Sequence, residues 1–143
     1  MAAEKEKKPS PVLFETQSEI IIGDEFVDPV YGHLEHDGYP VLLRRERERV
    51  IEEKGITLKD LETNFGIRGL VRQLHIEFFM PVKEGDRVTL VTSATLPRPF
   101  MLEFQHAMKT GDQVNAQASC LYVITNLSNR PVRIPLPLLG MLK

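Results

Sequence analysis

The chain has 143 residues, of which 42% are hydrophobic and 27% are charged, and its formal net charge at pH 7 is -2. A chain of this size buries enough apolar surface for one core, and its nearly neutral charge provides no field that would draw it to nucleic acid or to an anionic membrane. The one cysteine, Cys120, has no partner for an internal disulfide, and no apolar run approaches the roughly 20 residues of a membrane-spanning helix. We therefore expect a cytoplasmic protein that binds neither nucleic acid nor membrane.

The N-terminal segment MAAEKEKKPSP is charged and is not followed by the apolar stretch of a signal peptide. We expect residues 1–11 to be a disordered leader and residues 12–143 to form a single domain. From residue 12 to residue 22 the side chains alternate in the manner of a half-buried strand, with an inward set of Phe14, Thr16, Ser18, Ile20 and Ile22. Residues 23–38 contain a proline and three glycines, which predicts a long loop.

A helix is predicted from Tyr39 to about Lys54, with Gly55 as its stop signal. Its apolar stripe contains Tyr39, Leu42, Leu43 and Val50, while the rest of its surface is charged: Arg44, Arg45, Arg47, Glu48, Arg49 and Glu52. Glu46 departs from this pattern, because it lies three residues after Leu43 and four before Val50 and so falls on the apolar stripe. We expect this carboxylate to be buried.

After a short helical turn and loop, the sequence becomes strand-like. The segments GLVRQLHIEFFMP, RVTLVTSATL, FMLEFQHAMK and VNAQASCLYVIT predict consecutive antiparallel strands, and the proline-rich tail predicts one short edge strand. His75 and His106 lie within these strands, where a structural role is the more common one. No cluster of His, Cys and Asp has metal-site spacing, so we expect no metal and no tightly bound cofactor. One long helix with an antiparallel sheet is α+β.

Four segments, taken in order, resemble the hotdog-fold acyl-CoA thioesterases related to 4-hydroxybenzoyl-CoA thioesterase. They are GHLEHDGY at residues 32–39, RRER ending at Arg47, PVKEGD at 81–86 and RPVRIP at 130–135. The resemblance covers roughly residues 12–138. It implies a curved antiparallel sheet wrapped around one long central helix, an acyl-CoA or acyl-carrier thioester as substrate, and a homo-oligomer. That oligomer is a dimer with sheets paired edge to edge, or a dimer of dimers (a homotetramer), with active sites shared between two subunits.

Thioester hydrolysis needs a carboxylate to activate water or attack the carbonyl, and donors for the oxyanion. The resemblance implies Asp28 as the first candidate for this carboxylate. Asp28 stands four residues before Gly32, whereas the acid of the family usually stands three residues before the glycine. The alternative is that Asp28 and Pro29 merely begin a turn. Glu46 is the second candidate, because thioesterases of another branch place their acid on this helix. The alternative for Glu46 is a buried ion pair with an arginine of the same or a neighbouring subunit.

The remaining candidates surround the entrance of the predicted helix. His33 corresponds to a family histidine that positions the substrate, and Glu35 and His36 occupy the places of paired asparagines. Backbone N–H groups at Gly38 and Tyr39 are expected to polarise the thioester oxygen, with Asp37 as a possible N-cap. Cations that would hold the CoA phosphates are Arg68, Arg72 and Arg98.

Two other functions stay open. A hotdog hydroxyacyl dehydratase pairs the histidine of its GH motif with an acid about 14 residues later on the helix, and that position is Arg47 here, flanked by Glu46 and Glu48. A non-hydrolytic acyl-thioester binding protein would keep the fold without the chemistry.

Overall fold

The computed structural model describes residues 10–143, so the leader expected at residues 1–11 lies almost entirely outside the described residues. The elements follow in the order β1 (Val12–Ile21), α1 (Gly38–Glu53), α2 (Leu58–Phe65), β2 (Ile67–Phe78), β3 (Arg87–Arg98), β4 (Met101–Thr110), β5 (Gln113–Asn126) and α3 (Leu136–Leu142). Among the described residues, no helix has the length and apolar character needed to cross a membrane.

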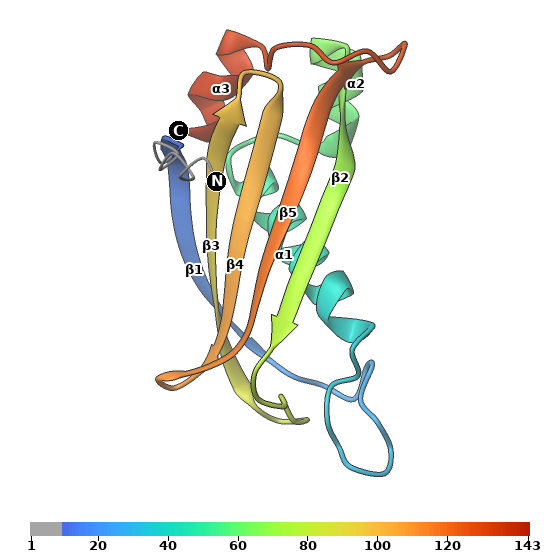
Figure 1. Cartoon of the computed structure of the whole chain (residues 1–143), viewed down its shortest axis with the longest axis vertical. Coiled ribbons are helices and arrows are strands. Elements are labelled where there is room, and N and C mark those ends of the chain that lie inside the picture. Colours follow the sequence, from blue (N-terminus) through green and yellow to red (C-terminus); the bar gives the residue numbers. More distant parts are fainter. Residues whose placement is uncertain (1–9) are drawn as a thin grey trace, which may run out of the picture.

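The strands form one curved antiparallel sheet in the order β1-β3-β4-β5-β2, and α1 runs along one face of it (Figure 1). β1 and β2 are therefore the two edges of the sheet. This arrangement confirms the expected α+β class with a long helix against a curved sheet.

Two apolar clusters fill the space between α1 and the sheet. Tyr39 and Leu43 belong to one cluster and Val50 belongs to the other, so the apolar stripe of α1 joins the two. The helix ends where the sequence predicts, because Gly55 takes a φ of 84° that glycine adopts without steric cost. Glu46 is 4% exposed, as expected from its place on the stripe.

The helix α2 has a complete N-terminal capping box. The Thr57 hydroxyl accepts from the Asp60 N–H at 3.1 Å, and the Asp60 carboxylate accepts from the Thr57 N–H at 3.0 Å. Gly66 then ends the helix in the left-handed region, which needs no Cβ. These local signals account for a full helix in a segment predicted only as a helical turn and loop.

The tail is a helix, so the prediction of an edge strand between prolines is wrong. Thr125 and Pro131 form one isolated bridge, after which α3 begins with Pro137 in its first turn, where a missing N–H costs little. Leu138 and Leu142 are four residues apart and both enter the core. Burial of this i, i+4 pair therefore selects the helix.

The edge strand β2 also differs from expectation. In the sequence, Leu70, Leu74, Ile76 and Phe78 alternate with polar residues, which is the pattern of a strand with one buried face. In the structure both faces are exposed from Gly69 to Phe78 except at Ile76. A register shift between Val71 and Gln73 interrupts the alternation. Because β2 is the last strand of the sheet, one of its edges has no strand beside it among the described residues.

Candidate functional site

The loop between β1 and α1 is folded back on itself by backbone hydrogen bonds. The Asp28 N–H donates to the His33 carbonyl at 2.8 Å, and the Glu35 N–H donates to the Phe26 carbonyl at 2.7 Å. The Asp28 carboxylate accepts one N–H on each oxygen, from Val30 at 3.1 Å and from Tyr31 at 3.0 Å. Asp28 therefore begins a turn, as its alternative interpretation predicted, and its carboxylate has a defined orientation and is partly exposed.

This loop meets the first turn of α1 at Gly38. A Cβ placed on Gly38 would lie 2.6 Å from the Cβ of Phe26 and 2.9 Å from Leu34, so only glycine allows this close approach. The Gly38 N–H donates to the Glu35 carbonyl at 2.9 Å and is thus already occupied. Asp37 stands at the N-cap position, but its side chain makes no capping hydrogen bond.

The first turn of α1 lies beside the free edge of the sheet. The Tyr39 side chain is buried, and its ring packs edge to face on Phe78, the last residue of β2, with ring centroids 4.8 Å apart. Since the Gly38 N–H is occupied and Pro40 has no N–H, the first-turn donor left without a partner among the described residues is the N–H of Tyr39. This N–H lies at the helix N-terminus, which carries a partial positive charge.

The two loop histidines differ in their surroundings. His33 is partly buried, forms a backbone bridge with Lys83, and places its ring 6.2 Å from the ring of Tyr31. His36 is exposed, as is Glu35, and neither side chain has a hydrogen-bond partner among the described residues.

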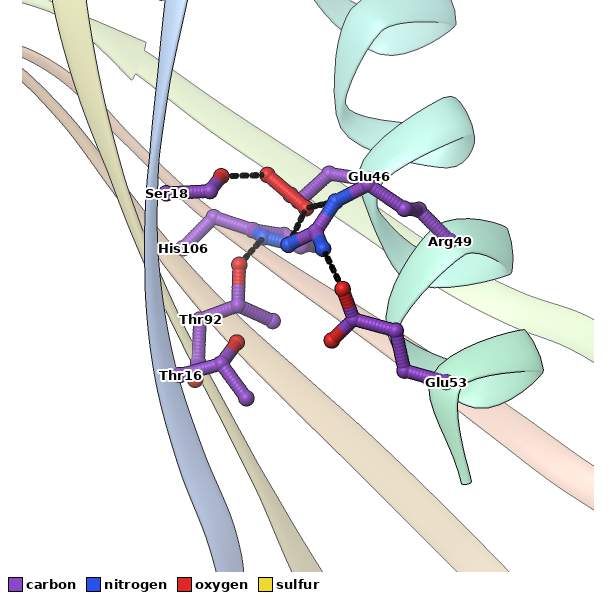
Figure 2. A network of polar contacts seen from close by, with 7 residues as sticks. All are labelled: Thr16, Ser18, Glu46, Arg49, Glu53, Thr92 and His106. Atoms are coloured by element: carbon purple, nitrogen blue, oxygen red, sulfur yellow. Dashed lines mark hydrogen bonds and ion pairs between the residues drawn. The ribbon is translucent and has the colours of Figure 1, made fainter. Parts of the chain in front are cut away.

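The second candidate acid, Glu46, lies in a polar network between α1 and β1 (Figure 2). Its Oε2 accepts from the Ser18 hydroxyl, and its Oε1 accepts from the Arg49 Nε at 2.6 Å; Arg49 also pairs with Glu53 on the next turn. Arg49 thus provides the ion pair that the alternative interpretation of Glu46 required. The helix period alone did not reveal that Ser18 would be its second partner, although Ser18 was placed on the inward face of β1.

Glu46 also borders a cavity of about 430 Å³ between the end of β1 and the middle of α1. Ile20, Leu42 and Leu90 supply apolar wall, while Arg45 and Arg49 contribute cationic groups. None of residues 26–41 lines this cavity, and Glu46 is seven positions after Tyr39, a rise of about 10 Å along α1.

A third polar cluster, not anticipated from the sequence, joins α1 to β3, β4 and β5. His106 is 4% exposed; its Nδ1 lies 3.0 Å from the Thr92 hydroxyl and its Nε2 lies 3.1 Å from Nη1 of Arg47. Burial, reinforced by the charge of Arg47, lowers the pKa of His106 from 6.5 to about 3, so the imidazole is neutral. The Arg47 Nε donates to the Tyr122 hydroxyl at 2.9 Å.

Arg47 corrects the predicted distribution of charge on α1. It was assigned to the exposed surface of the helix, but it is 6% exposed. The signal was present in the sequence, because Arg47 lies four residues after Leu43 and three before Val50, on the same stripe as Glu46.

The three arginines expected to hold CoA phosphates do not gather at the helix entrance of one chain. Arg68 is at the start of β2 and pairs with Glu62 at 2.6 Å, ten residues of strand or about 33 Å from Phe78. Arg98 ends β3 at the hairpin on the far end of the sheet (Figure 1). Arg72 is exposed in the middle of β2.

Within residues 10–143, no group of three or more His, Cys, Asp or Glu side chains is placed to hold a metal ion. The polar groups near the helix entrance are the oriented Asp28 carboxylate, His33, His36 and the Tyr39 N–H.

Comparison with known structures identifies the architecture. The 1,4-dihydroxy-2-naphthoyl-CoA thioesterase from Synechocystis superposes with a TM-score of 0.82 over 90% of this chain and 96% of its own, at 15% identity. A DHNA-CoA thioesterase from Staphylococcus aureus gives 0.71 over 83% and 80%, at 16% identity. A Staphylococcus aureus protein solved in complex with CoA gives 0.78 over 96% and 85%, at 14% identity. These likenesses show that the chain has the hotdog fold.

The identities to these structures are too low to assign the chain to a family, but a family model does so. The model of the thioesterase-like superfamily matches residues 22–142, which include the loop, α1 and strands β2 to β5 but not β1. The chain belongs to the thioesterase-like superfamily. No curated protein matches it in sequence.

Proposed function

We propose that this protein is a thioester hydrolase that cleaves an acyl-CoA or an acyl-carrier thioester to the free acid and the thiol. Membership of the thioesterase-like superfamily supports the reaction class. The observation that carries the proposal is the position of Asp28, whose carboxylate is oriented by two backbone amides in the loop that packs on the first turn of α1. Asp28 is two residues from Phe26, so its Cα lies within about 7 Å of the Phe26 Cα at the helix entrance.

The roles of the groups follow from their chemistry. An ionised carboxylate offers about four lone-pair sites, so Asp28 keeps acceptor capacity after binding the Val30 and Tyr31 amides and can activate water or attack the carbonyl. The Tyr39 N–H stabilises the developing oxyanion at the positive end of α1. His33 positions the substrate, with His36 as an exposed second group.

We propose that the protein acts as a homo-oligomer in which two β2 edges pair. β2 is an edge strand that exposes Leu70, Val71, Leu74 and Phe78, and an edge with exposed apolar side chains is a surface on which another chain can pair. Antiparallel pairing would bring the first half of a second β2, with its Arg68 and Arg72, beside the helix entrance. The phosphate-binding roles of these arginines are thus proposed across a subunit boundary, and we propose a cytoplasmic location.

A non-hydrolytic binding protein is the second candidate function. The observation that favours it is that both candidate acids already have structural partners: backbone amides for Asp28, and Ser18 and Arg49 for Glu46. The dehydratase alternative has less support, because the helix position that would carry its acid is Arg47, a buried cation beside His106.

The test is thiol release from short, long and aromatic acyl-CoAs by the wild type and by three variants. Asp28→Asn should lower kcat by at least about a hundredfold, the size of lost general-base assistance. Asp24→Asn, in the same loop but exposed, is the matched control and should behave as wild type. If Glu46→Gln alone abolishes turnover, the acid is Glu46. If the folded wild type binds acyl-CoA and releases no thiol from any substrate, the hydrolase proposal fails and the binding function replaces it.

A further inference from the structure

Arg47 is a buried cation with only neutral partners. Its Nε donates to the Tyr122 hydroxyl and its Nη1 to the neutral imidazole of His106, and its guanidinium carbon lies 5.8 Å from the centroid of the Tyr122 ring. Within residues 10–143, no carboxylate oxygen lies within 4.0 Å of any Arg47 nitrogen. Buried charges are normally paired, because removing an ion from water is costly unless a counter-charge compensates.

The guanidinium also has unused donors. A guanidinium carries five N–H bonds, and Arg47 uses one for Tyr122 and one for His106. Nη2 donates to no group among the described residues. The three remaining N–H bonds are on Nη1 and Nη2, the pair of atoms that binds a carboxylate in a two-point contact.

Arg47 lines an apolar cavity that is distinct from the cavity beside Glu46. The cavity has a volume of about 370 Å³, and Arg47 and Tyr122 contribute to its wall. The remainder is mainly aliphatic and aromatic, formed by the second half of α1, by α2, by α3 and by the sheet; Ile51, Leu61, Phe104 and Leu138 are examples. The apolar lining is suited to the apolar part of a ligand, and Arg47 is suited to bind one anionic group of the same ligand.

The acidic residues of the cavity rim do not neutralise Arg47. Glu48 pairs at 3.9 Å with Arg44, which is itself a half-exposed residue of the rim. Glu52 is exposed. No acidic side chain of the described part of the chain therefore neutralises Arg47.

We propose that this cavity binds a free carboxylic acid with an apolar chain, its carboxylate on Nη1 and Nη2 of Arg47 and its chain among the aliphatic side chains of α1, α2 and α3. Since a water molecule occupies about 30 Å³ of liquid, a space of this volume holds on the order of ten non-hydrogen atoms, the size of a medium-chain acid. The site lies beyond the proposed hydrolytic function, because it concerns binding of a free acid and needs neither Asp28 nor a thioester.

Isothermal titration with octanoate, 1-octanol and acetate tests the proposal on the full chain without any thioester. Octanoate should bind at least about tenfold more tightly than 1-octanol, which has the chain without the charge, and acetate should not bind measurably. Arg47→Gln should remove the preference for octanoate. Arg44→Gln changes an arginine that borders the same cavity with 58% of its side chain exposed, and should preserve the preference.

A second variant covers the case in which Arg47→Gln does not fold. Leu61→Trp leaves Arg47 in place and fills part of the cavity from α2, so it should weaken octanoate binding at least about tenfold. Equal affinity for octanoate and 1-octanol, or unchanged octanoate binding in either variant, overturns the proposal. Asp28→Asn should bind octanoate like the wild type, so loss of hydrolysis and loss of this site are measured separately.

Discussion

Nη1 of Arg47 lies 3.1 Å from Nε2 of His106, so a cation from the central helix and an imidazole from β4 meet in the protein interior. A guanidinium can only donate, and Nε2 must therefore accept. The neutral imidazole then carries its proton on Nδ1 and donates it to the Thr92 hydroxyl. This chain of contacts connects α1 to two central strands and fixes the orientation of Arg47.

The His106 environment predicts a pH-dependent stability. The pKa of His106 is lowered from 6.5 to about 3, first by burial and then by Arg47, so between these values the unfolded chain holds a proton that the folded chain does not. The contribution of His106 to the free energy of unfolding should be fully present above pH 6.5. It should fall as the pH decreases toward 3, by up to about 1.4 kcal/mol per pH unit. Urea denaturation at a series of pH values measures this slope.

His106→Gln should flatten the slope in that pH range, whereas His75→Gln should not. His75 is the appropriate control because it lies on β2 with 62% of its side chain exposed. The same slope in wild type and His106→Gln would show that other groups cause the acid sensitivity.

Gly38→Ala should destabilise the protein by about 1–3 kcal/mol, because its new methyl group would overlap Phe26 and Leu34. The same shift should move the loop that carries Asp28, so thiol release should fall as well. Thermal and urea denaturation measure the first effect. Gly23→Ala is the control: no atom lies within 4 Å of its added Cβ, and a change beyond about 0.5 kcal/mol there would contradict the steric explanation.

Leu74→Arg should dissociate the proposed oligomer, because it places a charge in the middle of the uncovered β2 strand, where Leu74 is 44% exposed. Sedimentation equilibrium should report a smaller particle, with reduced thioester hydrolysis if the site needs a second subunit. Val12→Arg is the matched change on the other edge, at a residue 62% exposed on β1. Dissociation by Val12→Arg and not by Leu74→Arg would assign the contact to β1.

Thr57→Ala should cost about 1 kcal/mol of unfolding free energy, since it removes the acceptor for the Asp60 N–H at the start of α2. Thr63→Ala, in the same helix, removes a hydroxyl that donates to the Lys59 carbonyl and caps no helix end. Denaturation of the two variants distinguishes capping from a general effect of losing a threonine. Equal losses would reject the capping explanation.

Much of the fold was predictable from local pattern. The period of α1, the stop at Gly55, the inward face of β1 and the alternation of β4 and β5 all follow from which residues can be buried on one side of a helix or strand. The burial of Glu46 was predicted in the same way. Each of these inferences needs only neighbours within one element.

Partners between elements were not predictable from the sequence. Nothing local indicates that Ser18 and Arg49 bind Glu46, that His106 accepts from Arg47, or that Phe26 requires a glycine at position 38. The tail was predicted to be an edge strand, because proline cannot donate the backbone hydrogen bond that an inner strand needs. It is instead a helix, because a helix buries Leu138 and Leu142 in the core beside α1 and the sheet.

The sequence by itself therefore determined the inward faces of β1, β4 and β5 and most of that of α1, with Arg47 as the exception. Only the tertiary structure decided which buried charges have a counter-charge and which do not. The reason is physical: hydrophobic periodicity acts within a helix or strand, whereas the pairing of a buried charge depends on atoms that packing brings together from distant parts of the chain.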